Sequence, residues 1–112
     1  MLPLWTVEFS QQAANDFDDI IRHTFKNFGQ RQAKGYSQLI GHSIQELSES
    51  GPSHPLAQDR SELIAGTQSM HIQRQGHRAK HILFFKTVTE NQTRKIVILR
   101  LLHKSMDFGE HL

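Results

Sequence analysis

Two stretches with helical spacing follow each other almost without a connection, and this restricts the fold more than any other feature. In residues 11–28 the stripe consists of Ala13, Phe17, Ile20, Ile21, Thr24, Phe25 and Phe28. The second stripe consists of Ala33, Tyr36, Ile40, Ile44 and Leu47. Because only one or two residues around Gly29 separate the stretches, they must form an antiparallel helical hairpin. Both stripes, with their Phe residues, are interpreted as core.

Polar residues mark the ends of the first helix. Ser10 is a suitable N-cap, and Gly29 is a suitable stop after the last turn. Asp16, Asp18 and Asp19 lie early in the helix, where the helix dipole favours acids. Residues i and i+2 of a helix point apart, so these aspartates are expected to be solvated charges rather than an acid cluster.

Four segments with strand character surround the hairpin. Residues 4–9 alternate between apolar and polar, and residues 69–74, 79–88 and 95–103 follow an irregular connection at 51–67. The last segment, KIVILRLLH, is almost continuously apolar, which is typical of a central strand covered on both faces. The order predicts an α+β fold: an N-terminal strand, a two-helix hairpin and a three-stranded antiparallel meander. The hairpin is expected to lie on an antiparallel sheet.

The alternation of strand residues predicts which side chains share a face. In the last strand one face carries Val97, Leu99, Leu101 and His103, and the other carries Ile96, Ile98, Arg100 and Leu102. In the strand before it, one face carries His81, Leu83, Phe85 and Thr87, and the other carries Lys80, Ile82, Phe84 and Lys86. Arg100 therefore interrupts an apolar face and needs a carboxylate partner. Two alternatives stay open: a partner within the chain, such as Glu8, or a carboxylate of another protein.

Length and composition indicate an ordinary globular protein. The 112 residues are expected to form a single domain over 1–112. With no cysteine, neither a disulfide framework nor a cysteine-ligated zinc site can form. The N-terminus does not resemble a secretory signal, and no stretch approaches the roughly 20 apolar residues of a membrane-spanning helix. We therefore expect a soluble cytoplasmic protein with no membrane partner.

The net charge of +2 hides a segregation along the chain. Residues 1–67 carry five Lys and Arg against eight acids, a net charge of −3. Residues 68–104 carry eight Lys and Arg against Glu90 alone, a net charge of +7. This basic half indicates either an acidic partner or a solvated sheet face whose lysines discourage edge pairing.

Sequence motifs give no support for a cofactor or a metal. No Walker loop, G-x-S-x-G, H-E-x-x-H or dinucleotide fingerprint occurs. His77 and His81 straddle the boundary between a turn and a strand, where an i, i+4 pair does not share a face. His71, His103 and His111 have no carboxylate or cysteine at ligand spacing. We expect neither a cofactor nor a metal site.

Three stretches resemble the ParE side of the RelE/ParE superfamily of bacterial toxins from type II toxin–antitoxin modules. FSQQAANDFDDIIRHTFKNFG is similar to the opening helix of that family, and AKHILFFK to its penultimate strand. ILRLLHKSMD is very close to its last strand, an aliphatic run ending in Leu-His and followed by a basic residue and Met-Asp. The resemblance covers nearly the whole chain and implies the same β-α-α-β-β-β fold.

The resemblance implies one of two activities. RelE-like members are ribosome-dependent mRNA endonucleases, which hold the scissile phosphate with sheet lysines and arginines and use a Tyr or His near the C-terminus as acid or base. ParE-like members inhibit DNA gyrase and lack that set. In this sequence the only tyrosine is Tyr36. Ser105 and Met106 stand near the position where nuclease members carry a key arginine. His71 and Gln73 stand at positions where nuclease members carry sheet lysines. A nuclease would have to rely on three other residues, His103, Lys104 and His111.

The leading hypothesis is therefore a toxin that inhibits gyrase by binding; a RelE-like nuclease and an inactive relic that binds only antitoxin are the alternatives. The candidate target-binding residues are Arg74, Arg78, Lys80, His81, Arg100, His103 and Lys104. His103 could equally be a hydrogen-bonded residue at the rim of the core.

The implied antitoxin is a small, ParD-like DNA-binding protein whose flexible C-terminal segment folds on binding. The candidate antitoxin-binding residues are Phe17, Phe25, Phe28 and Arg100. A homodimer and a toxin–antitoxin hetero-oligomer both stay open. Such modules imply a role in plasmid or chromosome stability.

Overall fold

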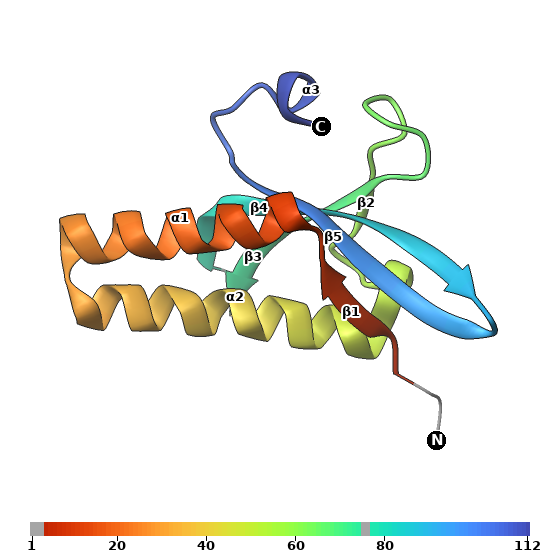
Figure 1. Ribbon diagram of the computed structural model, residues 1–112, viewed down its shortest axis with the longest axis horizontal. Coiled ribbons are helices and arrows are strands. Elements are labelled where there is room, and N and C mark those ends of the chain that lie inside the picture. Colours follow the sequence, from red (N-terminus) through yellow and green to blue (C-terminus); the bar gives the residue numbers. More distant parts are fainter. Residues whose placement is uncertain (1–3, 75–76) are drawn as a thin grey trace.

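The helical hairpin lies along one face of a five-stranded sheet (Figure 1). The computed structural model describes residues 4–74 and 77–112. In chain order the elements are β1 (Thr6–Phe9), α1 (Gln11–Phe28), α2 (Gln30–Ser50), η1 (Gly51–Ser53), β2 (Gln58–Asp59), β3 (Gln68–Arg74), β4 (His77–Glu90), β5 (Thr93–His103) and α3 (Phe108–His111). The predicted α+β order is confirmed, and η1, β2 and α3 are additions to it.

The hairpin begins and turns at the residues that the sequence indicates. The Ser10 hydroxyl accepts a hydrogen bond from the Ala13 N–H at 3.0 Å and donates one to the Leu99 carbonyl at 2.9 Å. Ser10 therefore caps α1 and also ties it to β5. At the other end, Gly29 has a φ of +90°, which lets the chain leave α1 and enter α2 at once.

The sheet has the strand order β1-β5-β4-β3-β2. The antiparallel meander of β3, β4 and β5 is confirmed, but the expectation of an antiparallel sheet is wrong for β1, which pairs with β5 in parallel. The hairpin explains this direction. It returns the chain to the start of β1, where the Trp5 N–H donates to the Ser48 carbonyl at 2.9 Å. β3 then runs in the same direction as β1. Because β4 is antiparallel to β3 and β5 is antiparallel to β4, β5 also runs in the direction of β1.

A β-bulge in β5 shifts the alternation of its side chains. Phe84 of β4 lies opposite Arg100 and Phe85 lies opposite Ile98, so Leu99 is an extra residue between the two pairs. The faces predicted for β4 are confirmed, whereas those predicted for β5 are wrong beyond the bulge. The core beneath the hairpin therefore receives three residues of β5: Ile96, Ile98 and Leu101.

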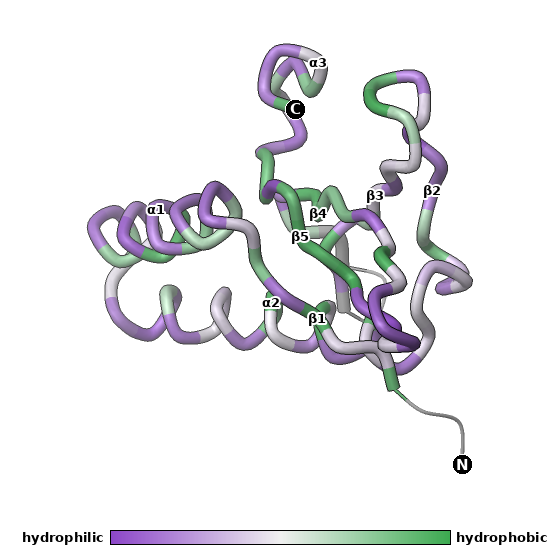
Figure 2. The backbone as a smooth tube through the Cα atoms, turned by 45° about the vertical axis from the view of Figure 1, so that its right-hand side comes forward, coloured by the Kyte–Doolittle hydropathy of each residue, from purple (hydrophilic) through white to green (hydrophobic). Residues whose placement is uncertain are grey.

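A second, smaller core covers the opposite face of the sheet. Ile82, Phe84 and Leu102 are buried there, and Phe108 and Leu112 from the C-terminal segment pack against them. In Figure 1 this segment and α3 lie on the side of the sheet away from the hairpin, and Figure 2 shows β5 as one of the most hydrophobic stretches of the backbone. The last strand is thus covered on both faces, as its composition predicts. Among the helices of the described residues, none has the length and apolar character needed to cross a membrane.

Candidate functional site: a groove at the strand ends

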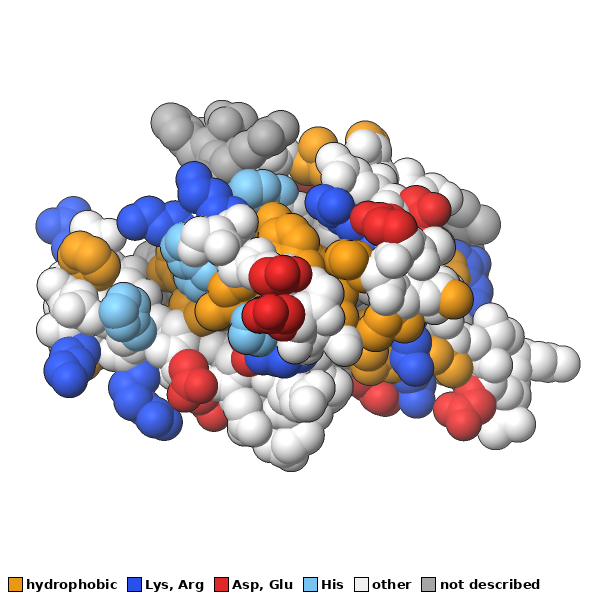
Figure 3. Space-filling view, turned by 90° about the horizontal axis from the view of Figure 1, so that it is seen from above, with side chains coloured by type: hydrophobic (Ala, Val, Ile, Leu, Met, Phe, Trp, Pro, Cys, Tyr) orange, Lys and Arg blue, Asp and Glu red, His pale blue; other side chains and the backbone are white. Residues whose placement is uncertain are grey.

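An open groove of about 750 Å³ lies between the helical hairpin and the place where β4 begins and β5 ends. We name it the strand-end groove. It is lined from α1 and α2 by Asp19, Ile20, His23, Thr24, Phe28, Gln32 and Tyr36, and from the strand ends by Ala79, Lys80, His81, His103, Ser105 and Met106. Figure 3 shows histidine and hydrophobic side chains beside Lys and Arg on the half of the molecule that carries the hairpin tip.

Tyr36 fixes the orientation and protonation of His81. The Tyr36 hydroxyl oxygen lies 2.6 Å from His81 Nδ1. Burial raises the pKa of Tyr36, so its phenol keeps its proton at neutral pH and can donate. Burial, followed by the repulsion that a protonated His81 would meet from a protonated His103, lowers the pKa of His81 to about 4. The His81 ring is therefore neutral at pH 7, with Nδ1 as acceptor and the proton on Nε2.

His103 is held in a similar way by the turn after β5. Its Nδ1 accepts a hydrogen bond from the Ser105 backbone N–H at 3.1 Å and lies 2.7 Å from the Ser105 hydroxyl. A backbone N–H can only donate, so in the neutral ring of His103 the proton is on Nε2. The rings of His81 and His103 meet edge to face, with centroids 5.3 Å apart.

The predicted target-binding residues divide into separate groups. Lys80, His81 and His103 come together in the strand-end groove. The Lys104 N–H donates to the Lys80 carbonyl at 2.7 Å, which joins the two strand ends. Lys104 itself is exposed beside the groove. The side chains of Arg74 and Arg78 lie outside the described part of the structure.

Arg100 has its partner within the chain, but the partner is Asp16 rather than Glu8. Arg100 Nε and Nη2 donate to the two carboxylate oxygens of Asp16 at 2.7 and 3.0 Å. The Leu101 N–H adds a third hydrogen bond to Asp16 at 2.9 Å. The expectation that Asp16 is a solvated charge is therefore wrong, and the charge of Arg100 is neutralised internally. Glu8 instead pairs with Lys95 at 3.2 Å.

The three phenylalanines of α1 do not share one environment. Phe17 packs against the main core and contacts Phe9 edge to face at 6.2 Å. Phe25 and Phe28 are 57% and 64% exposed, so their assignment to the core is wrong. They lie in the last turn of α1, where the hairpin extends beyond the sheet, and Phe28 lines the strand-end groove.

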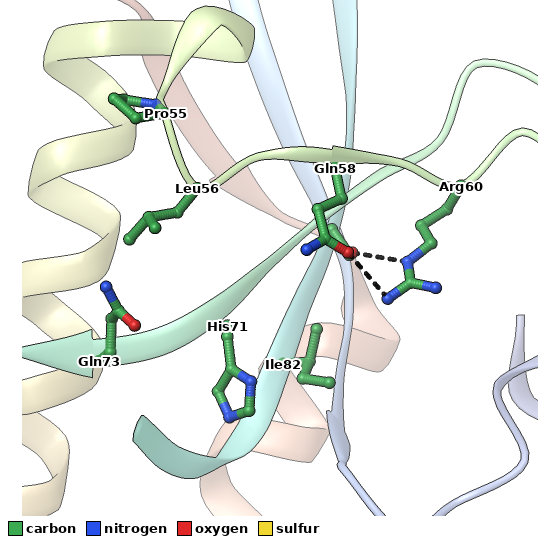
Figure 4. A pocket seen from close by; sticks show the side chains of 8 residues that line it. Pro55, Leu56, Gln58, Arg60, His71, Gln73 and Ile82 are labelled. Carbon is green, nitrogen blue, oxygen red and sulfur yellow. Dashed lines mark hydrogen bonds between the residues drawn. The ribbon is translucent and has the colours of Figure 1, made fainter. Parts of the chain in front are cut away.

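A second pocket of about 310 Å³ lies on the sheet face opposite the hairpin (Figure 4). Two of its polar side chains are engaged within the chain: His71 Nε2 donates to the Ala79 carbonyl at 2.6 Å, and Arg60 Nε donates to the Ser69 hydroxyl at 2.8 Å. His111 lies in α3, where its carbonyl accepts from Arg100 Nη1 at 2.8 Å. Of the three nuclease candidates, His103 lines the groove, Lys104 follows it at the exposed edge, and His111 lies in α3, outside the described lining.

The groove combines neutral hydrogen-bonding side chains with apolar ones. The strand-end groove offers hydrogen-bonding groups, and the pKa of His81 near 4 leaves little protonated imidazole at that residue to act as a general acid at neutral pH. Nor do the described residues contain a cluster of three or more His, Asp or Glu side chains that could hold a metal ion. Tyr36, Ser105 and Met106 belong to the groove although the sequence did not indicate them as binding residues.

The family of the chain follows from its sequence over most of its length. Residues 7–108 match the family described as the ParE toxin of the type II toxin–antitoxin system parDE. The chain belongs to this family of ParE toxins. A comparison with curated protein sequences gives no match.

Two solved structures share the ParE-family fold. One is a chromosomal ParDE system from P. aeruginosa, with 22% identity, 91% of this chain and 98% of the other covered, and a TM-score of 0.70. The other is the RelBE2 toxin–antitoxin complex from Mycobacterium tuberculosis, with 20% identity, 90% and 99% coverage, and a TM-score of 0.55. At these identities the likeness concerns the fold.

Proposed function

We propose that this ParE-family toxin inhibits DNA gyrase by binding it, and that a ParD-like antitoxin neutralises the toxin. Membership of the family supports the role of toxin in a type II module. The surface proposed for gyrase is the strand-end groove together with Lys104. It is open, it lies where the basic half of the chain meets the hairpin, and it contains three of the residues that the sequence indicated.

The observation that carries the proposal is the state of two side chains of this groove, His81 and Tyr36, which are joined by a hydrogen bond. An endonuclease needs an acid or base whose pKa lies near the working pH and cations that hold the phosphate. In the groove, burial keeps the pKa of His81 near 4, and Tyr36 remains protonated. On the opposite sheet face, His71 is bound to a backbone carbonyl. A protein that acts by occupying a surface of its target needs neither feature.

Expression of the toxin without its antitoxin tests the proposal. Gyrase inhibition predicts filamentous cells with double-strand breaks in their DNA, while cellular messages remain intact. Translation arrest with cut messages would instead identify a ribosome-dependent nuclease. Harmless expression of folded protein would identify a relic that only binds antitoxin.

Single charge variants locate the surface. Lys80→Gln and Lys104→Gln should reduce gyrase inhibition, since each removes an exposed cation beside the groove. Lys34→Gln is the matched control, because Lys34 is an exposed lysine of α2 that does not line the groove in the described part of the chain. Equal inhibition by all three variants would place the gyrase-binding surface elsewhere.

A further inference from the structure

We propose that the tip of the helical hairpin is a binding site for single-stranded DNA. The hairpin tip is the end of α1 and the start of α2, residues 22–31. Its phenylalanines, Phe25 and Phe28, would stack on unpaired bases, and its cations would hold the neighbouring phosphates. The choice of DNA rests on the proposed function, since the proposed target, gyrase, acts on DNA. Both phenylalanines are also candidate antitoxin contacts, so antitoxin and DNA would compete for the tip.

Two aromatic side chains at the tip are open to solvent. Phe25 is 57% and Phe28 is 64% exposed, and neither belongs to the two core clusters of the described residues. They lie three residues apart at the end of α1, so they are neighbours on the helix surface. Figure 1 shows that this end of the hairpin extends beyond the sheet, so the sheet does not cover the rings. Exposed aromatic rings of this kind are platforms on which unpaired bases stack.

The charge of the tip is entirely positive. Residues 20–45 contain four of the five Lys and Arg of the first 67 residues and none of their eight acids. Arg22, Lys26 and Arg31 belong to the tip and are exposed. Within the described residues, the one ion pair of these three joins Arg22 to Asp19 at 4.0 Å, with both side chains largely exposed. Such a surface pair is weak, so all three cations can bind phosphates.

The basic C-terminal half is less suited to the same ligand, because much of its charge is engaged within the chain. Arg94 lies over the ring of Trp5 at 4.3 Å, and Lys95 and Arg100 each pair with a carboxylate. Among the described residues, the exposed large hydrophobic side chains that are aromatic are the two phenylalanines of the tip. The tip therefore combines stacking rings with unpaired cations, as binding of single-stranded nucleic acid requires.

The other side chains of the tip favour DNA over a membrane or an acidic protein. Asn27 and Gln30 are exposed amide side chains, which insertion into lipid would deprive of water. A protein surface presents donors as well as acceptors, and the tip has no carboxylate to pair with its cations. The phosphates of DNA present acceptors alone. Duplex DNA fits less well than a single strand, because its stacked bases cannot lay their faces on the rings.

Fluorescence anisotropy with labelled oligonucleotides tests the site without gyrase. The probe is oligo(dT) of about 12 nucleotides, and the comparisons are a DNA duplex and oligo(rU) of the same length. The full-length protein should bind oligo(dT) about tenfold more tightly than the duplex, the gain expected from one stacked base. Binding of the duplex as tightly as oligo(dT), or of oligo(rU) more tightly, would overturn the inference.

Variants at the tip show whether the binding occurs there. The double variant Phe25→Ala, Phe28→Ala should weaken oligo(dT) binding about tenfold or more. Lys26→Gln should lower the slope of log affinity against log salt by about one unit, because it removes one phosphate contact. The matched controls are Ile64→Ala and Lys86→Gln, at exposed sites remote from the tip, and both should bind oligo(dT) like the wild type.

The side chains changed at the tip are exposed, so the variants should fold like the wild type, which circular dichroism checks. Undiminished oligo(dT) binding by the double phenylalanine variant would contradict the site, as would an equal change of salt slope in Lys26→Gln and Lys86→Gln. Gyrase inhibition is measured separately. Oligo(dT) binding by a protein that leaves gyrase unaffected would refute the proposed function alone, and gyrase inhibition without oligo(dT) binding would refute the tip site alone.

Discussion

The ion pair of Asp16 and Arg100 gives the sharpest prediction about stability. Asp16 accepts three hydrogen bonds, two from Arg100 and one from the Leu101 N–H, and the two charged side chains are 15% and 19% exposed. Removing one partner of a buried ion pair costs roughly 3–5 kcal/mol, because the other charge stays buried. Arg100 retains some solvent and its bond to the His111 carbonyl, which lowers the expected cost. Asp16→Ala should therefore reduce the free energy of unfolding by about 3 kcal/mol.

Urea unfolding, followed by circular dichroism, measures this cost. Asp18→Ala is the matched control, because Asp18 is an exposed aspartate of the same helix, and it should change stability by less than about 0.5 kcal/mol. A double-mutant cycle with Arg100→Met isolates the pair, since methionine keeps most of the length of the side chain without its charge. We expect a coupling energy of about 2 kcal/mol.

A coupling energy near zero, with Asp16→Ala no worse than Asp18→Ala, would refute this account of the ion pair. It would mean that Arg100 is free in solution and available to a partner. If the account holds, any loss of toxicity in an Arg100 variant results from lower stability of the toxin and not from the loss of a contact with its target. Lys104, which is exposed, is the better residue for testing the contribution of charge to binding.

Three further predictions test other parts of the structure. The pKa of His81 is about 4 in the folded protein and 6.5 for an ordinary histidine, so the unfolded state takes up this proton first and stability falls as the pH is lowered from 7 toward 4. Between pH 7 and pH 5 the wild type should lose about 2 kcal/mol more than His81→Phe in parallel urea titrations, and equal losses would contradict the buried neutral ring. Ser10→Ala should cost about 1–2 kcal/mol in the same assay, because Ser10 both caps α1 and bonds to β5; a cost below about 0.3 kcal/mol would show that the cap is dispensable. Gly51→Ala should lower the melting temperature clearly, because Gly51 has a φ of +66° and an added Cβ would collide with the indole ring of Trp5, and an unchanged melting temperature would contradict this close approach.

The sequence predicts the hairpin and the meander well because local patterns define them. The apolar stripe between Ser10 and Gly29 gives α1 with its observed bounds. The almost continuous apolar run of β5 requires cover on both faces, and Phe108 provides part of that cover. Features that depend on tertiary geometry could not be predicted in this way. One extra residue, Leu99, reverses the alternation of β5, and nothing in the local sequence marks the bulge.

Long-range pairs account for the remaining differences. Asp16 and Arg100 are 84 residues apart, and their meeting depends on how α1 crosses the end of β5. The candidate site was partly accessible from sequence, because Lys80, His81 and His103 all lie at strand ends in the basic half. Tyr36 was not, since its position on the inner face of α2 indicates core. Only the tertiary structure brings its hydroxyl to His81.

Supercoiling of relaxed plasmid by purified DNA gyrase, in the presence of increasing amounts of purified toxin, tests the central claim most directly. The account predicts dose-dependent loss of supercoiling that Lys80→Gln weakens and Lys34→Gln does not, with ribosome-bound message left intact in a parallel reaction. Supercoiling that continues undiminished while the same protein cuts ribosome-bound message would contradict it.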